Sequence, residues 1–598
     1  MKFLKAFLAA LLAVVVGGFL STFIWIMVLA GMAGSMESPV VVEENSILKI
    51  DFMEQITDSP STDPLAGFDF QSLEMTPSLS LYKVLQAIDA ARNDERIKGI
   101  YIRPIAMDAI SGAAMEELRA ALVEFKQSGK FILAYSEVYT QGSYYIASVA
   151  DKIYLQKEGA ISWQGLSSTT PFFKGLFDKL DIEYEIFRPT VCKYKSAVEP
   201  YFLKRMSPEN REQMQQVVNS MWSVVAGDVA ASRGFESVEE LNRLTDRLAL
   251  CLPEDALKNG MVDGLIYEDE MEPIFAEQGV ERNADQEFNF ITLGDYAAQL
   301  IPDVEHITDP AITILYADGA IVDGEGTVQG EIYGNTLASQ IAELRKDEEV
   351  KAVVVRVNSP GGSALASDVI WREMSLLRDE KPVIISMGNY AASGGYYISA
   401  PADVILADRL TLTGSIGVFG AFPVMGEMAE KQLGITFDGV KSNSSADFGE
   451  GFLMGSIRPA TPAQRAYLIR SVDKVYESFT TKVSSGRNLP IEQVLEIAGG
   501  RVWTGVDALQ IGLVDGHGGL KAAIGVAAEK AGLSDYRVEE YMPEMEGFAA
   551  LLSGLNVRLK AQHELDALGE ALLPYKKARE VLKQQGVLMY MPYEITLF

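Results

Sequence analysis

Short apolar runs rich in β-branched residues alternate along this chain with longer segments in which apolar residues recur at helical spacing. The short runs predict buried strands, and the longer segments predict amphipathic helices. Strands are expected at residues 97–102, 131–135, 152–155, 352–357, 383–387 and 404–407, and helices at residues 81–92, 113–127, 336–345 and 366–377. This alternation favours parallel βαβ units with both sheet faces covered, and therefore an α/β fold.

The chain also contains an internal repeat. The segment Tyr144–Asp151 returns as Tyr396–Asp403, and residues 255–264 return as 507–516, each time with the same offset (396 − 144 = 252). Two similar segments at one spacing indicate one fold that has been duplicated in tandem.

An uncharged stretch at residues 6–33 follows Lys2 and Lys5 and precedes Glu37. A bilayer span needs about 20 apolar residues, so this stretch predicts a transmembrane helix, with a cleaved signal peptide as the alternative. The flanking lysines place the N-terminus in the cytoplasm and the rest of the chain outside. The expected division is an N-terminus and anchor in residues 1–36, a first repeat in 46–280, a linker in 281–310, a second repeat in 311–541 and a C-terminal extension in 542–598.

Composition narrows the function classes. The net charge of −30 disfavours nucleic-acid binding, which needs a basic surface. The chain has only two cysteines and three histidines, so we expect no metal site and no cofactor. The scarcity of histidine also disfavours a histidine-based catalytic triad, and the pattern leaves open whether Cys192 and Cys251 form a disulfide.

Ser393 is the candidate nucleophile. The apolar run at residues 382–387 leads into a segment of small residues at 389–397, which predicts a strand, a tight turn and then a helix. Ser393 would stand at the helix N-terminus, where free N–H groups favour a developing negative charge. The alternative is that Ser393 merely caps the helix. In the first repeat its place is taken by Gln141, so only the second repeat keeps a nucleophile.

A glycine-rich loop at residues 357–363 distinguishes the second repeat from the first. The corresponding segment at 102–107 has no glycine. Glycines let backbone N–H groups point into a cavity, so Gly361 or Gly362, together with Gly394, would form an oxyanion hole. The alternative for this loop alone is an ordinary glycine-rich turn.

The general base is expected to be a lysine, provided that burial lowers its pKa toward neutrality. Lys195 and Lys441 stand at nearly equivalent places in the two repeats. Sequence periodicity does not decide between them, and most lysines are solvated surface residues.

Four motifs together resemble the two-repeat signal peptide peptidase A (protease IV) family, membrane-anchored bacterial serine proteases, over essentially the full chain. They are Tyr194–Pro200 (YKSAVEP), Asn358–Ser363 (NSPGGS), Ala391–Tyr396 (AASGGY) and Thr413–Gly417 (TGSIG). The resemblance implies a Clp-protease/crotonase-like fold in each repeat and assembly into a homotetramer.

The resemblance also implies a catalytic dyad built across the two repeats, with Ser393 as nucleophile, Lys195 as base and Ser415 orienting the lysine amine. Lys195 lies in a largely apolar segment, which favours its desolvation. Lys441 stands where single-repeat relatives carry their lysine and remains the alternative base.

The function expected from this resemblance is an endopeptidase of the cell inner membrane that degrades cleaved signal peptides on the periplasmic side. Its partners would be peptides, the lipid bilayer and further copies of the chain. Two other hypotheses are a crotonase-type acyl-CoA enzyme, which would share the oxyanion hole, and a non-catalytic membrane scaffold.

Overall fold

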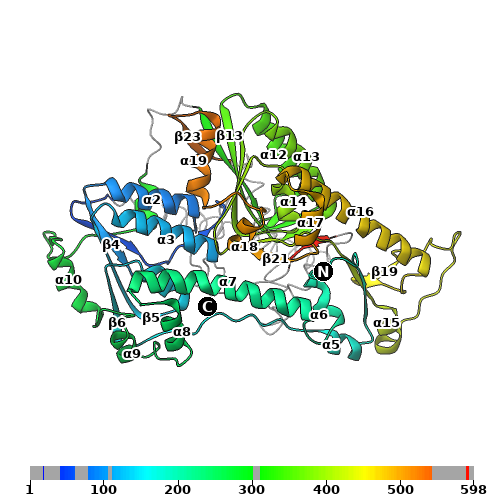
Figure 1. The fold of residues 1–598 in the computed structure, drawn as a ribbon, viewed down its shortest axis with the longest axis horizontal. Coiled ribbons are helices and arrows are strands. Elements are labelled where there is room, and N and C mark those ends of the chain that lie inside the picture. Colours follow the sequence, from blue (N-terminus) through cyan, green and yellow to red (C-terminus); the bar gives the residue numbers. More distant parts are fainter. Residues whose placement is uncertain are drawn as a thin grey trace, which may run out of the picture.

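The computed structural model describes residues 18, 41–60, 78–105, 111–300, 310–541 and 588–591 (Figure 1). The predicted transmembrane stretch lies outside this part of the chain, apart from Gly18, as do residues 301–309 of the expected linker and most of the C-terminal extension. Among the residues described, no helix combines the length and the apolar character needed to cross a bilayer.

The first sheet has six strands in the order β8-β6-β5-β4-β1-β9, and every neighbouring pair is parallel. The strands are β1 (Ser46–Ile50), β4 (Ile97–Ile102), β5 (Phe131–Tyr139), β6 (Lys152–Ile161), β8 (Gly264–Leu265) and β9 (Phe290–Thr292), with helices α2 (Leu81–Asn93), α3 (Gly112–Lys126) and α4 (Gln141–Ala147) between them. The predicted strands and helices of this half are confirmed, although β5 and β6 run further than expected.

The second sheet repeats this order as β22-β16-β15-β13-β10-β23, again with parallel pairs. These strands are β10 (Ala311–Asp318), β13 (Val350–Ser359), β15 (Val383–Ala392), β16 (Val404–Ala407), β22 (Gly516–His517) and β23 (Arg537–Glu540). Strand β15 also pairs with β17 (Leu412–Gly414), which pairs antiparallel with β21 (Val502–Thr504). Two sheets with one strand order therefore follow the internal repeat in the sequence.

Alternate residues of β13 face opposite layers, as a strand requires. Val353 and Val355 belong to the apolar cluster of α12 (Gly334–Lys346) and α13 (Ala364–Arg378), whereas Val354 belongs to that of α19 (Leu520–Ala531). Figure 1 shows these helices on either side of the sheet. The sequence of β13 is a near-continuous apolar run because both faces of this parallel strand are buried.

One segment of the first half of the chain lies on the second. Strand β7 (Glu183–Phe187) pairs antiparallel with β18 (Gly420–Val424) of the second half. The chain then forms η1 (Ser196–Val198), α6 (Glu199–Phe202) and the long helix α7 (Pro208–Arg233), which runs back along the molecule (Figure 1). Because β7 pairs with β18, the residues around position 195, which belong to the first half of the chain, lie next to the second sheet.

The two halves are also joined by ionic contacts. Glu116 of α3 pairs with Arg409, and Glu117 accepts a hydrogen bond of 2.6 Å from the backbone N–H of Leu520. The buried Arg356 lies 2.7 Å from Glu117 and 2.6 Å from Asp58. Buried charges need such partners, so these contacts fix how the two sheets sit together.

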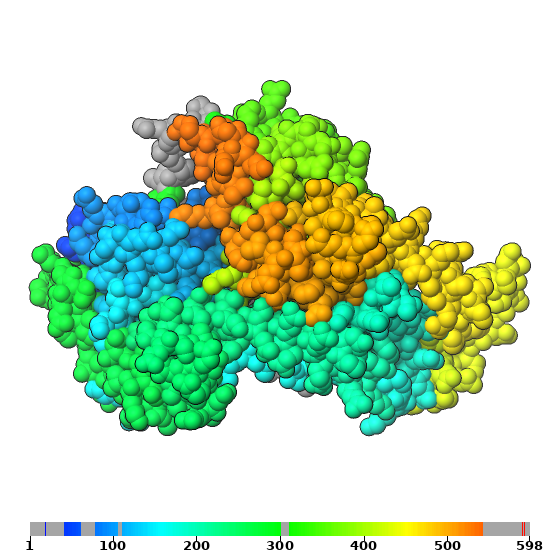
Figure 2. Space-filling view, viewed as in Figure 1, coloured from blue at the N-terminus to red at the C-terminus, as the bar shows by residue number. Residues whose placement is uncertain are grey.

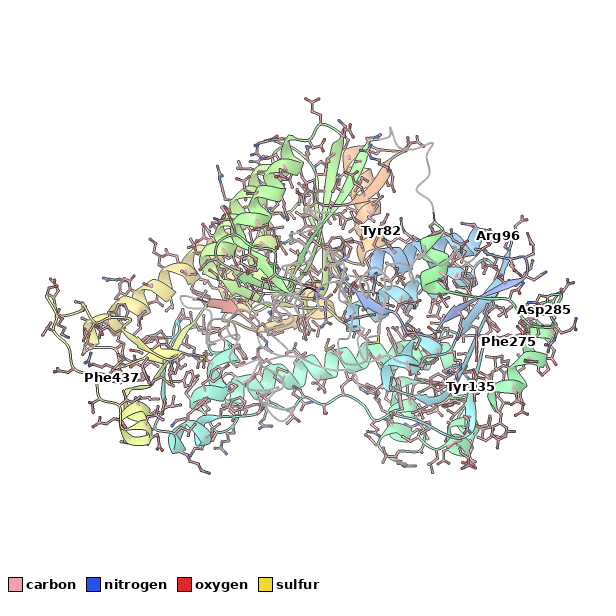
Figure 3. All side chains as sticks on the ribbon, turned by 180° about the vertical axis from the view of Figure 1, so that it is seen from behind. Tyr82, Arg96, Tyr135, Phe275, Asp285 and Phe437 are labelled. Carbon is pink, nitrogen blue, oxygen red and sulfur yellow. The ribbon has the colours of Figure 1, made fainter. Side chains whose placement is uncertain are left out.

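A projection made by α15 (Gly426–Leu433), β19 (Gly451–Phe452) and β20 (Gly455–Ser456) stands out from the body in the space-filling view (Figure 2, yellow). Phe437 marks it in Figure 3, at the opposite end of the molecule from Phe275. Lys441 belongs to this projection, four residues after Phe437.

Candidate active site

Ser393 lies between the end of β15 and the start of α14 (Gly394–Ser399), as the sequence predicts. Its backbone has φ 57° and ψ −112°, a strained conformation for a residue with a side chain. The side chain is fully buried and makes no hydrogen bond to the first turn of the helix. Helix capping therefore does not explain this serine, whereas a strained strand-to-helix turn is typical of a nucleophile.

Lys195 lies directly before η1 and reaches the serine from the first half of the chain. Its Nζ is 2.6 Å from Ser393 Oγ, 3.0 Å from Ser415 O and 3.0 Å from Ser415 Oγ. Only 1% of the residue is exposed. The structure thus brings together three residues that are far apart in the sequence.

Burial lowers the pKa of Lys195 from 10.5 to about 7, because the charged form loses its hydration. The three groups within hydrogen-bond distance of Nζ are neutral oxygens, so none of them stabilises an ammonium as a carboxylate would. A neutral amine has one lone pair and two N–H groups, and the three oxygens around Lys195 Nζ match these three positions. Lys195 Nζ donates to the carbonyl and the hydroxyl of Ser415, and a neutral Nζ is placed to accept the proton of Ser393 Oγ.

Ser415 is held in place by the backbone. It has φ 49°, and its N–H donates to the carbonyl of Arg501 at 2.7 Å. The preceding Gly414 accepts a hydrogen bond of 2.8 Å from the N–H of Ser393. The serine and the oxygens that hold the lysine therefore belong to adjoining backbone segments.

The glycine-rich loop reaches Gly394, although Gly361–Ser363 forms a short strand, β14, rather than a simple turn. A Cβ placed on Gly361 would lie 2.6 Å from the backbone N of Gly394, and one on Gly394 would lie 3.1 Å from the N of Gly362. Gly361 has φ 98°, which favours glycine. Its own N–H donates to Ser359 Oγ at 3.2 Å, so Gly362 and Gly394 are the candidate pair of oxyanion donors.

The model of peptidase family S49 matches residues 124–278 and 375–534. The chain belongs to peptidase family S49. Protease 4 of Salmonella typhi is 34% identical over 554 residues, which cover 90% of this chain and 87% of that protein. The protein named "Serine protease SPPA, chloroplastic" from Arabidopsis thaliana is 31% identical and covers 82% of this chain and 70% of its own length.

Among solved structures, a ClpP1 mutant from Listeria monocytogenes matches with a TM-score of 0.23 and 11% identity, covering 36% of this chain and 94% of that one. A likeness at this TM-score has no weight in assigning the fold. Membership of family S49 makes the chain a serine peptidase, which excludes the acyl-CoA enzyme and the non-catalytic scaffold.

Lys441 of this S49 peptidase is not brought to Ser393. It lies exposed on the projection, where its Nζ is 2.8 Å from Asp447 Oδ2 and 3.3 Å from the carbonyl of Ser444. Its contact is with a carboxylate of the projection itself. Its position therefore offers no base to the serine.

Gln141 fills the corresponding place in the first sheet. Its Oε1 accepts hydrogen bonds from the N–H of Gln164 at 3.2 Å and of Gly165 at 3.0 Å. Gly165 corresponds to Gly417, whose carbonyl lies 3.4 Å from Ser393 Oγ. The glutamine thus binds the first-half counterpart of the loop that flanks Ser393 in the second half.

Two residues of the site were missed in the sequence. A Cβ on Gly500 would lie 2.5 Å from Lys195 Cβ, so glycine is needed where this loop meets the lysine. Gln213 of α7 donates to Ser196 Oγ at 2.6 Å and accepts from the N–H of Val502 at 3.2 Å. The glycine pair at 499–500 could have indicated a close backbone approach from the sequence alone, whereas the sequence around Gln213 has no feature that indicates its role.

The two cysteines are both free. Cys192 is buried three residues before Lys195, and burial raises the pKa of its thiol to about 11. It therefore packs as a small apolar residue rather than as a nucleophile.

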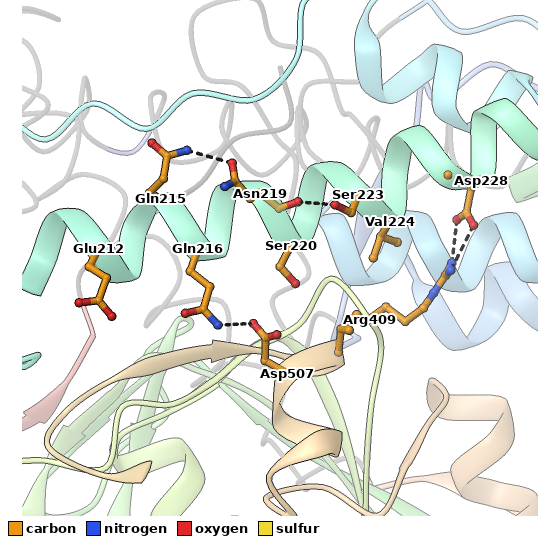
Figure 4. A pocket seen from close by; sticks show the side chains of 12 residues that line it. Glu212, Gln215, Gln216, Asn219, Ser220, Ser223, Val224, Asp228, Arg409 and Asp507 are labelled. Atoms are coloured by element: carbon orange, nitrogen blue, oxygen red, sulfur yellow. Dashed lines mark hydrogen bonds and ion pairs between the residues drawn. The ribbon is translucent and has the colours of Figure 1, made fainter. Parts of the chain in front are cut away.

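A pocket of about 780 Å³ lies along α7 (Figure 4). It is lined by polar groups from both halves, among them Gln216, which donates to Asp507 at 3.4 Å, and Asp228, which pairs with Arg409. None of the candidate catalytic residues lines it. The pocket belongs to the contact between the halves and not to the serine site.

Proposed function

We propose that this S49 peptidase is a membrane-anchored endopeptidase that uses Ser393 as nucleophile and Lys195 as general base. The observation that carries the proposal is the 2.6 Å contact between Lys195 Nζ and Ser393 Oγ in a fully buried setting. Burial lowers the pKa of the amine to about 7, so about half of the Lys195 side chains are neutral at pH 7, and a base must be unprotonated to accept a proton.

In the first step Lys195 Nζ takes the hydroxyl proton of Ser393 as Oγ attacks the carbonyl carbon of the scissile bond. The N–H groups of Gly394 and Gly362 hold the oxyanion of the tetrahedral intermediate, with Gly361 shaping the loop. When the C–N bond breaks, Lys195 delivers the proton to the leaving amine. Water then attacks the acyl-enzyme, with Lys195 again as base, and the serine hydroxyl is restored.

The proposal also covers the setting of the enzyme. Residues 1–36 would form a single-pass inner-membrane anchor with a cytoplasmic N-terminus, and residues 46–280 and 311–541 would be two Clp-protease/crotonase-like repeats in the periplasm. The uncharged N-terminal stretch and its flanking charges support this topology. Signal peptides with apolar cores are the proposed substrates, and a homotetramer is the proposed assembly.

Three variants test the dyad on an apolar reporter peptide. Ser393→Ala and Lys195→Ala should each abolish hydrolysis, while Lys441→Ala should retain it because that lysine lies exposed on the projection. A serine-directed fluorophosphonate should label the wild type and not Ser393→Ala. An active Lys195→Ala beside an inactive Lys441→Ala would overturn the assignment of the base.

A further inference from the structure

A short strand from the C-terminal extension lies against the candidate oxyanion loop. Strand β24 (Leu588–Tyr590), the short red strand in Figure 1, pairs antiparallel with β14 (Gly361–Ser363). The pairing continues for one more residue, because the N–H of Met591 donates to the carbonyl of Pro360 at 2.7 Å. The chain therefore adds its own strand beside the glycines of the site.

The backbone of β24 comes close to the oxyanion donors. A Cβ placed on Gly361 would lie 2.0 Å from the carbonyl oxygen of Met589 and 2.6 Å from the backbone N of Gly394. The Met589 carbonyl oxygen and the Gly394 backbone nitrogen therefore lie close to the same point beside Gly361, next to Ser393. A peptide carbonyl in this region stands where a substrate carbonyl must approach.

Two side chains anchor the strand. Met589 is 0% exposed and Met591 is 2% exposed, and residues two apart point to the same side of a strand. Met589 belongs to the main apolar cluster of the second sheet, whereas Met591 belongs to the cluster that contains Ala392 and Leu412. Methionine is unbranched and fills irregular apolar sites readily.

Without β24, strand β14 would be the end of its sheet. The order of this sheet is β12-β11-β14-β24, with β11 (Ala320–Val322) on the other side of β14. An exposed strand edge offers unpaired N–H and C=O groups and binds extended peptides by adding a strand. The edge beside Ser393 is therefore suited to a peptide substrate, and β24 covers it.

We propose that residues 588–591 act as a built-in competitive inhibitor of this peptidase. They occupy the place of a substrate strand, so a substrate must displace them before it pairs with Gly361–Ser363. The substrate then places unbranched apolar side chains, two residues apart, in the sites that Met589 and Met591 fill. This inference rests on the proposed function of Ser393 as the nucleophile.

The test uses the full-length enzyme and two variants of the strand. Met589→Asp puts a charge in a buried apolar site, and Met591→Pro removes the N–H that donates to Pro360. A tethered segment competes at an effective concentration in the millimolar range, so each variant should raise kcat/KM for a short apolar peptide by about tenfold or more. Val440→Asp, at a fully exposed site, is the matched control and should leave kcat/KM unchanged.

A synthetic peptide with the sequence of residues 586–594 should inhibit both variants competitively and the wild type more weakly. Thermal unfolding identifies a variant that has lost its fold. If both folded variants keep the wild-type kcat/KM, the inhibitor role is refuted, and the proposed function is untouched. Cleavage of the wild-type chain within 588–591, absent in Ser393→Ala, would make the segment a substrate and would also refute that role. Activity that survives Ser393→Ala would instead refute the proposed function.

Discussion

The assignment of Lys195 as a neutral base makes a prediction about stability as well as activity. The pKa of Lys195 is lowered to about 7 in the fold, whereas an unfolded lysine titrates near 10.4. Between these values the unfolded chain binds a proton that the folded chain does not, so the free energy of unfolding falls as pH drops from about 10.5 to 7. Below pH 7 both states are protonated and the loss is complete.

Lys195→Met removes this cost because methionine has a similar length and no charge. About three pKa units at about 1.4 kcal/mol each give a cost on the order of 4 kcal/mol at pH 7. Against this, the substitution leaves the carbonyl and hydroxyl of Ser415 and the hydroxyl of Ser393 without their partner, which costs about 1–3 kcal/mol. The net expectation is a stabilisation of about 1–3 kcal/mol at pH 7 that reverses above pH 10.5.

Urea unfolding of both proteins at pH 7 and at pH 10.5 measures this effect. Lys441→Met is the matched control, because an exposed ion pair contributes about 0–1 kcal/mol. The activity arm follows kcat/KM of the wild type, which should rise with pH through an apparent pKa near 7. At pH 8 about nine in ten Lys195 side chains are neutral, against roughly one in 250 for an ordinary lysine.

One outcome would refute this reasoning. If Lys195→Met were less stable than the wild type by the same amount at both pH values, the lysine would not change its protonation on folding. Lys195 would then be charged in the enzyme at pH 7, and it would not serve as the base.

Three further predictions concern the surroundings of the dyad. Gly500→Ala should lower kcat by about 100-fold or more in a folded protein, because its Cβ would push against Lys195 and displace the base; near-wild-type kcat would show that this contact does not position the lysine. Gln213→Ala should lower kcat by about tenfold with KM little changed, since Gln213 holds Ser196 beside Val502; Gln213→Glu, which keeps the acceptor for the N–H of Val502, should recover part of the loss, and a change in KM alone would argue against positioning. A metal chelator should leave peptide hydrolysis unchanged, and inhibition reversed by zinc would contradict a Ser/Lys mechanism.

The sequence identified most of the sheet architecture because the central strands are buried on both faces. The four valines of Val353–Val357 are all buried, as a strand covered on both faces requires, and the shared offset of 252 revealed the duplication. The end of β15 was misjudged. The small-residue segment that begins at 389 predicts a turn, but pairing of Ala391 with Thr413 of β17 extends the strand to Ala392. That pairing depends on a partner 22 positions away and leaves no local pattern.

Periodicity alone left the two lysines open and the resemblance favoured Lys195; the structure adds where each side chain lies. Lys195 and Lys441 stand at nearly equivalent places in the two repeats, and their burial depends on which neighbour each segment pairs with. The pairing of β7 with β18 carries Lys195 under the second sheet, whereas the segment with Lys441 projects into solvent. The sequence does not predict the role of Gln213 for a related reason, since that role depends on a contact between α7 and Val502, which lie far apart in the sequence.

The absence of a serine at position 141 and the exposure of Lys441 have one explanation under the proposed dyad. Lys195 of the first repeat contacts Ser393 of the second repeat, so under the proposed dyad a lysine serves a site outside its own repeat. By the same relation, Lys441 would serve a serine at position 141, but Gln141 stands there and binds Gly165. With no nucleophile to activate, nothing favours burying Lys441, and a buried lysine carries a large desolvation cost. An exposed Lys441 is therefore the expected consequence of a duplicated fold in which only the second repeat carries the serine.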